Sequence, residues 1–175
     1  MGATVQTPPS TEAVPETQRS TASDTEQLIA AARALGPLIR EHADEAERER
    51  RLSAPVRDAL TEQGFQRMLA PRSLGGWELD PVGCARVVEE VARFDSAAGW
   101  ALQAANINVW WASRLPDQGV TEIYGANPST LMAAAFHPPQ QATVERGGYR
   151  ITGRAPLASN VHDCEWILIS AVVMD

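Results

Sequence analysis

The segment GGYRITGRAPLASNVHDCEWILISAVVMD, from Gly147 to Asp175, decides how this chain is classified. Its Gly-Gly pair separates two short runs, Ala142–Arg146 and Tyr149–Thr152, and such a pair is typical of a two-residue hairpin turn. A run of β-branched and apolar residues, Trp166–Met174, follows and predicts another strand. The sequence therefore places strands at the end of the chain.

Upstream of these strands, apolar residues recur with the period of a helix. In the run Leu28–Ile39 they fall three and four positions apart, which predicts a first helix. The charged run EHADEAERERR follows and is typical of a solvated helix face. Within it, Asp44 and Arg48 are four positions apart, so we expect them to form an ion pair.

Capping residues mark the boundaries of the following helices. Ser and Asp side chains accept hydrogen bonds from the first free N–H groups of a helix, and proline is tolerated in the first turn. Glycine ends helices in the left-handed conformation. These signals predict helix starts at Ser53, at Asp80-Pro81 and at Asp95 or Ser96, a stop at Gly64, and a short helix from Asp117 to Tyr124.

The order of these elements indicates the fold class. The spacing of the apolar residues changes after the helices, and the run Leu131–Phe136 predicts a buried strand. Helices followed by strands are typical of an α+β fold or of two successive domains. We expect an all-α helical domain over residues 25–127 and strands over residues 128–175. Residues 1–24 are rich in Thr, Ser, Pro and Glu, so we expect a disordered tail.

Composition excludes several classes of function. The net charge of −7 argues against nucleic-acid binding, which usually requires a basic face. No apolar run is long enough to span a bilayer, so we expect no membrane segment. The two cysteines, Cys84 and Cys164, are too sparse for a disulfide framework, and a cytoplasmic setting is expected.

Three groups of residues are candidates for chemistry. The run His162–Glu165 holds four ligand-type residues, but neighbours on a strand point to opposite faces, so we expect a polar loop without a metal. His137 stands at a strand end beside two prolines and is either a structural residue or a site residue. Trp100, Asn106 and Trp110 lie on one predicted helix, which serves either core packing or as the wall of a substrate pocket.

Several stretches, in the same order and spacing, resemble the acyl-CoA dehydrogenase superfamily. They are MLAPRSLGGWELD after LTEQGF, then RVVEEVARFDSAAGW, then GGYRITGRAPLASN followed by EWILISAV. The resemblance runs from Leu28 to Asp175 and implies an N-terminal helical domain, a central β-barrel and a C-terminal helical bundle. It implies that this chain holds the first domain and the start of the barrel, as the front part of a larger, tetrameric enzyme.

The resemblance also points to a branch of that superfamily. Acyl-CoA dehydrogenases carry a Thr-Glu pair and a Gly-Ser-Asp where this chain has AAAFHPPQQATVERGG. The chain looks more like the two-component monooxygenases, which use flavin reduced by a separate reductase. Those enzymes commonly have Ser-Gly where this chain has Ser159-Asn160.

The same resemblance implies roles for individual residues around FAD or FMN. Ser159 would offer its hydroxyl to the N5 side of the flavin, beside Asn160, and backbone amides near Ala135 would reach the polar edge of the ring. Phe136 and Leu157, with the tryptophans, would keep the pocket dry, which protects a reactive oxygen adduct from water. A further candidate, His137, would polarise a phenol-like substrate.

We therefore expect a flavin-dependent monooxygenase that acts on an aromatic or apolar small molecule with a flavin reductase as partner. Two alternatives remain open from the sequence. One is an FAD-dependent acyl-CoA dehydrogenase, whose catalytic base would be a carboxylate outside this chain. The other is a non-catalytic helical interaction domain or an inactive truncated product.

Overall fold

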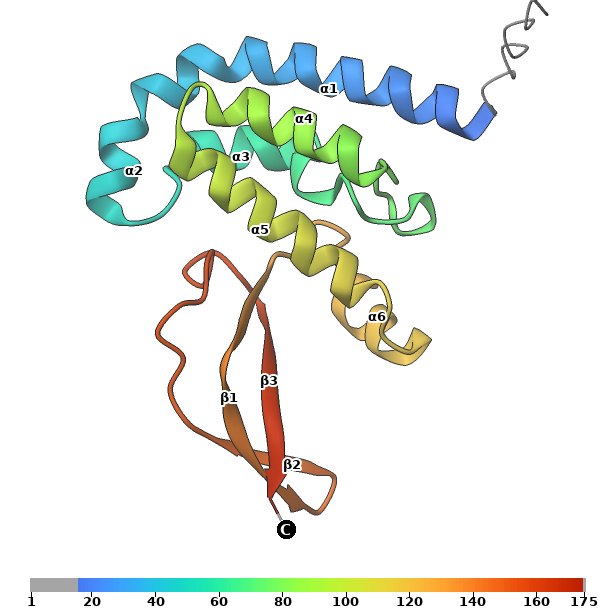
Figure 1. Cartoon of the computed structure of the whole chain (residues 1–175), viewed down its shortest axis with the longest axis vertical. Helices are drawn as coiled ribbons and strands as arrows, with labels where there is room; N and C mark the ends of the chain where they lie inside the picture. The colour runs from blue at the N-terminus through green and yellow to red at the C-terminus, as the bar shows by residue number, and fades with distance from the viewer. Residues whose placement is uncertain (1–15, 175) are drawn as a thin grey trace, which may run out of the picture.

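The computed structural model describes the backbone of residues 16–174 and side chains from residue 22 onward. Six helices precede three strands, in agreement with the α+β expectation (Figure 1). The helices are α1 (Glu16–Glu41), α2 (Ala43–Glu49), α3 (Ala54–Glu62), α4 (Pro81–Ala92), α5 (Ser96–Ala112) and α6 (Asp117–Tyr124), with two short 3-10 turns, Phe65–Arg67 and Arg72–Leu74. The strands are β1 (Met132–Glu145), β2 (Gly148–Thr152) and β3 (Trp166–Met174).

The helices pack around one hydrophobic core, in which α1 lies against α4 and α4 lies against α5. The apolar stripes that the sequence predicts face this core. Its most deeply buried side chains are Leu28, Ile39, Leu60, Phe65, Met68, Val87, Val91 and Leu102. A second, smaller cluster joins the end of α5 and α6 to the first residue of β1, Met132.

Two of the predicted caps are confirmed by their hydrogen bonds. Asp80 accepts from the backbone N–H groups of the next turn, and Asp95, rather than Ser96, does the same for α5. Gly64 has φ +71°, the left-handed conformation expected after α3. Ser53 precedes α3 as predicted but makes no capping bond, and its buried Oγ has no partner among the described residues. Pro55 explains this in part, because it removes an N–H that such a cap would accept from.

Two expectations about the first helices differ from the structure. The predicted tail includes residues 16–24, which belong to α1, while residues 1–15 lie outside the described part of the chain. Tertiary contacts hold the end of this stretch, since Asp24 pairs with Arg72 and the adjacent Thr25 is buried. The expected pair of Asp44 with Arg48 does not form, because Arg48 instead pairs with Glu49.

The three strands form one sheet in the order β2-β1-β3. The predicted hairpin at Gly147 is confirmed, with β1 and β2 antiparallel from Gln141 to Glu145. The two strands predicted at 131–136 and 142–146 are one continuous strand, β1, which pairs with β3 in parallel. The register shifts between Ala135 and Gln140, so residues 136–139 lie outside the ladder pairs with both neighbours.

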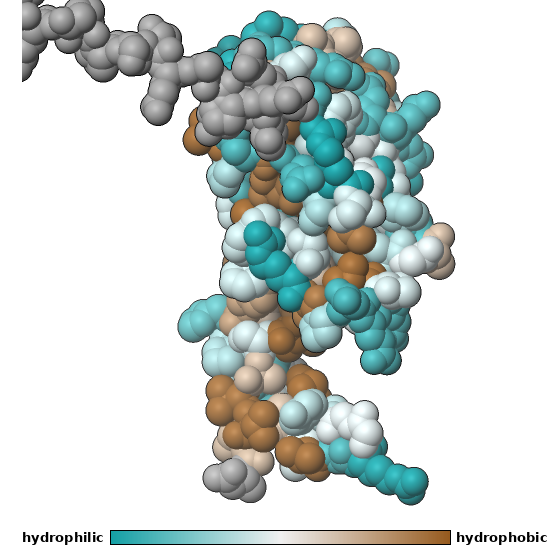
Figure 2. Space-filling model, turned by 90° about the vertical axis from the view of Figure 1, so that its right-hand side faces the viewer, coloured by the Kyte–Doolittle hydropathy of each residue, from teal (hydrophilic) through white to brown (hydrophobic). Residues whose placement is uncertain are grey.

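The sheet projects from the helical domain below α5, with α6 to one side of its upper end (Figure 1). Its side chains are far more exposed than those of the helices, and Figure 2 shows hydrophobic residues gathered over this strand end. The exposed apolar side chains of the strands include Val144, Tyr149, Ile167, Ile169, Val172 and Val173. None of the helices in the described residues is long and apolar enough to cross a membrane.

Candidate functional site

One face of α5 forms the wall of the candidate site. Trp100, Ala104, Ile107 and Trp111 are spaced by four, three and four positions, so they share a face of the helix. The two tryptophans remain 67% and 51% exposed, although α5 is apolar on every side. A helix of this kind is normally covered all round. The stripe from Trp100 to Trp111 is therefore a surface suited to a flat apolar ligand.

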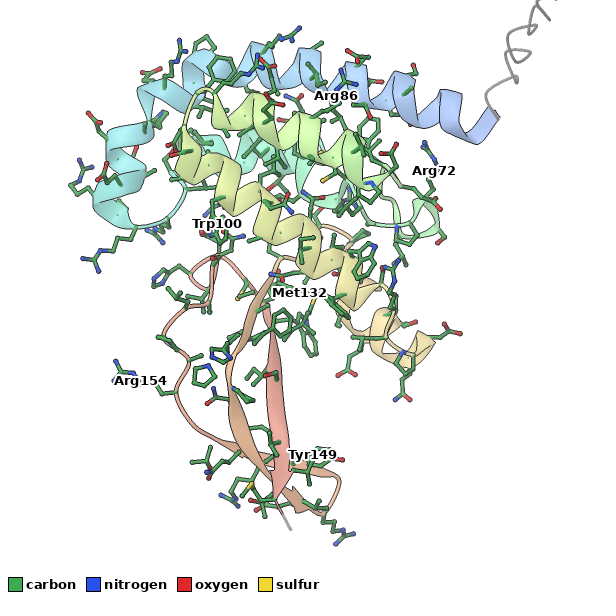
Figure 3. The ribbon with its side chains drawn as sticks, in the orientation of Figure 1. Arg72, Arg86, Trp100, Met132, Tyr149 and Arg154 are labelled. Carbon is green, nitrogen blue, oxygen red and sulfur yellow. The ribbon has the colours of Figure 1, made fainter. Side chains whose placement is uncertain are left out.

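One end of this stripe contacts the loop that carries Ser159. The indole Nε1 of Trp100 donates a hydrogen bond to the Ser159 hydroxyl oxygen at 2.9 Å. Next to it, the Asn160 side chain donates from Nδ2 to the carbonyl oxygen of Ala101 at 2.8 Å. Figure 3 shows Trp100 between α5 and the tip of this loop. The two bonds bring the predicted residues Trp100, Ser159 and Asn160 together.

The backbone of Asn160 explains why glycine is not required beside the serine. Asn160 has φ +67°, in the left-handed region where glycine and asparagine are the favoured residues. Asparagine tolerates this conformation and adds the bond to Ala101, which glycine would lack. The departure from the Ser-Gly pattern is therefore compatible with the same loop shape.

A partly buried ion pair anchors the same loop to α3. Arg57 Nη1 donates to Asp163 Oδ1 at 3.0 Å, and the Asp163 side chain is only 9% exposed. Arg57 also pairs with the exposed Asp58. The hydrogen bonds that Arg57 donates to Asp58 and to Asp163 raise the pKa of its guanidinium above the usual value, so it stays charged. The Ser159 loop is thus held to the helices at three points.

The other end of the α5 stripe contacts β1. The rings of Trp111 and Phe136 meet edge to face, with centroids 6.4 Å apart. Phe136 and His137 are exposed and lie in the stretch of β1 outside the ladder pairs, directly after the buried Ala135. The Phe136 carbonyl accepts a hydrogen bond from the Ser170 hydroxyl at 2.6 Å. No titratable group among the described residues ion-pairs with His137.

An open groove of about 950 Å³ borders the Ser159 loop. Its walls come from α2, from the start of α5 and from residues 156–163, and include Trp100, Leu157, Ser159 and His162. Leu157 is 79% exposed, so its side chain is available to an apolar ligand. The volume falls in the range of small-molecule and cofactor sites.

The donors in this region fit a flavin. An isoalloxazine ring requires an apolar surface for its faces and hydrogen-bonding groups for its polar edge. Ser159 supplies a hydroxyl that donates to no acceptor among the described residues, and residues 136–139 of β1 lie outside the ladder pairs with both neighbouring strands. Gly153 stands at the start of the loop and lies close to β1. A Cβ atom added at this glycine would lie 1.8 Å from Gln140 Oε1, so a larger residue would clash there.

Two of the predicted substrate contacts have other partners. Asn106 is fully buried, and its amide bonds to the Phe65 and Leu102 carbonyls and to the Leu69 N–H, so it joins helices within the core. The face of the Trp110 ring is covered by the Arg114 guanidinium, 3.6 Å from the centroid. Both residues therefore support α5, and we leave both out of the proposed ligand contacts.

Sequence reasoning missed the ion pair that anchors the loop. Arg57 and Asp163 are 106 positions apart, and no local pattern connects them. The contact of Trp111 with Phe136 on β1 was also missed. The spacing of eleven between Trp100 and Trp111 was the available signal, because eleven residues make three helical turns.

Comparison with known protein families agrees with this geometry. Residues 22–114, which cover α1 from Ala22, α2 to α4 and α5, match the family model "Acyl-CoA dehydrogenase, N-terminal domain". The chain belongs to the acyl-CoA dehydrogenase N-terminal domain family. The fold expected from the sequence, a helical domain followed by strands, is confirmed.

The most similar proteins include several flavin-dependent monooxygenases. The indole-3-acetate monooxygenase of Pseudomonas putida is 36% identical over 110 residues, which are 63% of this chain and 28% of that protein. The flavin-dependent monooxygenase oxygenase subunit HsaA of Rhodococcus jostii is 28% identical over 81% of this chain and 37% of its own length.

Solved structures of the same branch superpose on the chain. The structure of XiaF from Streptomyces sp. in complex with FADH2 and glycerol superposes with a TM-score of 0.88 at 25% identity, over 92% of this chain and 41% of that one. The HsaA monooxygenase of M. tuberculosis superposes with a TM-score of 0.81 at 26% identity, over 86% and 40%. This acyl-CoA dehydrogenase-type chain thus spans about two fifths, or less, of these relatives.

Proposed function

We propose that the protein containing this chain is the oxygenase component of a flavin-dependent monooxygenase that acts on an aromatic small molecule. One observation carries the proposal. The two segments that the family resemblance assigns to the flavin, residues 135–136 and 157–160, both contact the exposed aromatic face of α5. A flavin against this face would meet a hydroxyl, the stretch of β1 after Ala135 and exposed tryptophan rings.

The proposed site assigns a role to each of these residues. The Ser159 hydroxyl contacts the N5 side of the flavin, and Asn160 holds Ser159 in place through Ala101. Backbone groups at Ala135 and Phe136 meet the polar edge of the ring, and Leu157 covers an apolar face. When bound, reduced flavin supplies the electrons with which O2 is activated to oxygenate the substrate.

The relatives support the choice of substrate and partner. One of them is named an indole-3-acetate monooxygenase. Another, from Rhizobium, is named an FADH(2)-dependent resorcinol hydroxylase, oxygenase component. We propose an aromatic substrate that stacks against either Trp100 or Trp111, with His137 as the residue that polarises a phenolic hydroxyl. A separate flavin reductase supplies the reduced FAD or FMN, and the assembled protein is a homotetramer in the cytoplasm.

The decisive experiment uses the complete natural protein with an added flavin reductase, NADH and O2. We expect indoles and phenols to gain one oxygen atom, detected by mass spectrometry with ¹⁸O2 as the oxygen source. A parallel anaerobic assay adds acyl-CoA thioesters to the protein with bound FAD. Bleaching of the flavin by a thioester, without oxygenation of any aromatic compound, would replace the monooxygenase with an acyl-CoA dehydrogenase.

A variant tests the role of the serine within that experiment. Ser159→Ala removes one hydrogen bond to the flavin, so we expect flavin affinity to fall several-fold while the fold is retained. Isothermal titration with oxidised and reduced flavin measures the change, and far-ultraviolet circular dichroism controls for folding. Equal affinity and equal turnover of the variant would return Ser159 to a structural role.

A further inference from the structure

We propose that one ordered water molecule joins the Ser159 loop to the helical domain, bound between Gln66, Asn160 and Asp163. The site is a small cavity of about 10 Å³, which shares Asn160 and Asp163 with the wall of the groove. The other residues of its lining come from α3, from the first 3-10 turn, from α5 and from their flanking segments. A cavity of this size has room for a single water molecule.

Gln66 carries a polar group that no described residue satisfies. It is only 6% exposed and lies in the 3-10 turn Phe65–Arg67. The Thr61 hydroxyl lies 2.9 Å from Gln66 Oε1 and occupies that end of the amide, whereas Nε2 has no hydrogen-bond partner among the described residues. In that part of the chain Ser53 Oγ is the only fully enclosed polar side-chain atom without a partner, so Gln66 Nε2 is open to a water-sized space.

Two side chains of the loop carry acceptors that are also free. Asp163 Oδ1 accepts from Arg57 Nη1 at 3.0 Å, which leaves Oδ2 without a partner among the described residues. Asn160 Nδ2 donates to the Ala101 carbonyl at 2.8 Å, which leaves Oδ1 free in the same way. Asn160 and Asp163 line the cavity together with Gln66. One donor and two acceptors therefore border a single small space.

Water matches these groups in number and in kind. A buried water makes about three hydrogen bonds. Here it accepts from Gln66 Nε2 and donates to Asp163 Oδ2 and Asn160 Oδ1. If the Gln66 amide is turned over, so that Oε1 faces the cavity, water can still donate to it and to one of the loop oxygens. The cavity favours a neutral ligand over an ion, because Arg57 and Asp163 carry opposite charges there.

The water ties the loop to a segment that its direct side-chain bonds do not reach. Those bonds end on α3 at Arg57 and on α5 at Trp100 and Ala101. Gln66 lies beyond the end of α3, in the turn that leads away from it. A water-mediated bond is nearly as favourable in enthalpy as a direct one, so the bridge adds a further attachment beside Ser159.

A crystal structure of the complete natural protein, at a resolution that shows ordered water, is the direct test. We expect an electron-density peak in the cavity, within hydrogen-bond distance of Gln66, Asn160 and Asp163. A dry cavity, or a side chain that fills it, would overturn the inference. A protein that holds this water but binds no flavin would support the water site and refute the proposed function, so the two are tested separately.

A variant tests whether the water holds the loop in place. Gln66→Met has a side chain of similar length without an amide, so its crystal structure should lack the water peak. The loss of one water-mediated bond should speed amide hydrogen exchange in residues 159–163 by about 2- to 10-fold. Exchange in α4, which does not line the cavity, should stay the same.

Gln63→Met is the matched control for this variant. Gln63 is exposed, lies three positions before Gln66 and does not line the cavity, so the same substitution should leave exchange in residues 159–163 unaltered. Circular dichroism checks that both variants are folded. If Gln66→Met loses the water without faster exchange in residues 159–163, or if Gln63→Met speeds that exchange equally, the water does not hold the loop and the inference is wrong.

Discussion

The helices and the sheet of this chain bury their apolar residues very differently. Val87 and Val91 on α4 and Leu102 on α5 are almost inaccessible to solvent. In β2 every residue is exposed, and in β3 none is buried. Both regions are rich in apolar side chains, so the contrast lies in packing and not in composition.

The contrast shows which part of the chain is complete as a packing unit. Helices α1, α3, α4 and α5 close around a shared core because they bury apolar side chains against one another. A sheet has two faces and two edges, and a three-stranded sheet needs cover on at least one face for stability. Since the relatives are more than twice as long, we propose that other parts of the protein or a second subunit cover the strands.

The largest expected effect tests the helical side of this contrast. Phe65 is fully buried, so Phe65→Ala should lower the free energy of unfolding by about 3–5 kcal/mol. Val144 on β1 is 65% exposed, and Val144→Ala should change the free energy of unfolding by less than about 0.5 kcal/mol. Urea unfolding followed by circular dichroism compares the two. Similar losses for both would show that the strands are as well packed as the helices.

An intermediate effect tests the junction between the helices and the sheet. Burial raises the pKa of Tyr124 to about 12, and its hydroxyl contacts Met132 Sδ at the start of β1. The folded protein therefore holds this proton more tightly than the unfolded chain, which loses it near pH 10. The contribution of Tyr124 to stability should be complete below pH 10 and should be lost between pH 10 and 12, by about 2–3 kcal/mol.

Variants of the two tyrosines check this pH dependence. Tyr124→Phe has no proton to lose and should make the decline in stability between pH 10 and 12 less steep. The Cys84 thiol, whose pKa burial raises to about 12, keeps its own share of the decline. Tyr149→Phe, on the exposed β2, should leave the decline unchanged. Equal slopes for the two variants would contradict burial of Tyr124 at the junction.

The smallest effect concerns the tie between α3 and the Ser159 loop. Asp163→Asn weakens a charge-assisted hydrogen bond from Arg57 at a mostly buried site, so we expect a loss of about 1.5 kcal/mol. Asp58→Asn affects the same arginine at an exposed site and should cost less than about 1 kcal/mol. A larger loss for Asp58→Asn than for Asp163→Asn would show that Asp58, and not Asp163, is the more important partner of Arg57.

Local patterns were sufficient for most of the fold. The caps at Asp80 and Asp95, the stop at Gly64 and the hairpin at Gly147 depend on neighbours within a few positions, and all four were predicted. Ser53 was predicted as a cap from the same kind of signal, but it makes no capping bond. A pattern of residue types places a helix start without specifying which side-chain bond forms there.

The sequence by itself determined the helical period, most of the helix ends, the hairpin and the resemblance to a family, since these depend on residue types at short spacing. Only the tertiary structure decided that Trp100 meets Ser159, that Arg57 meets Asp163 and that β1 pairs with β3 in parallel. These contacts join residues far apart in the chain. Their formation depends on how α5, the loop and the sheet pack together, and no local spacing encodes that packing.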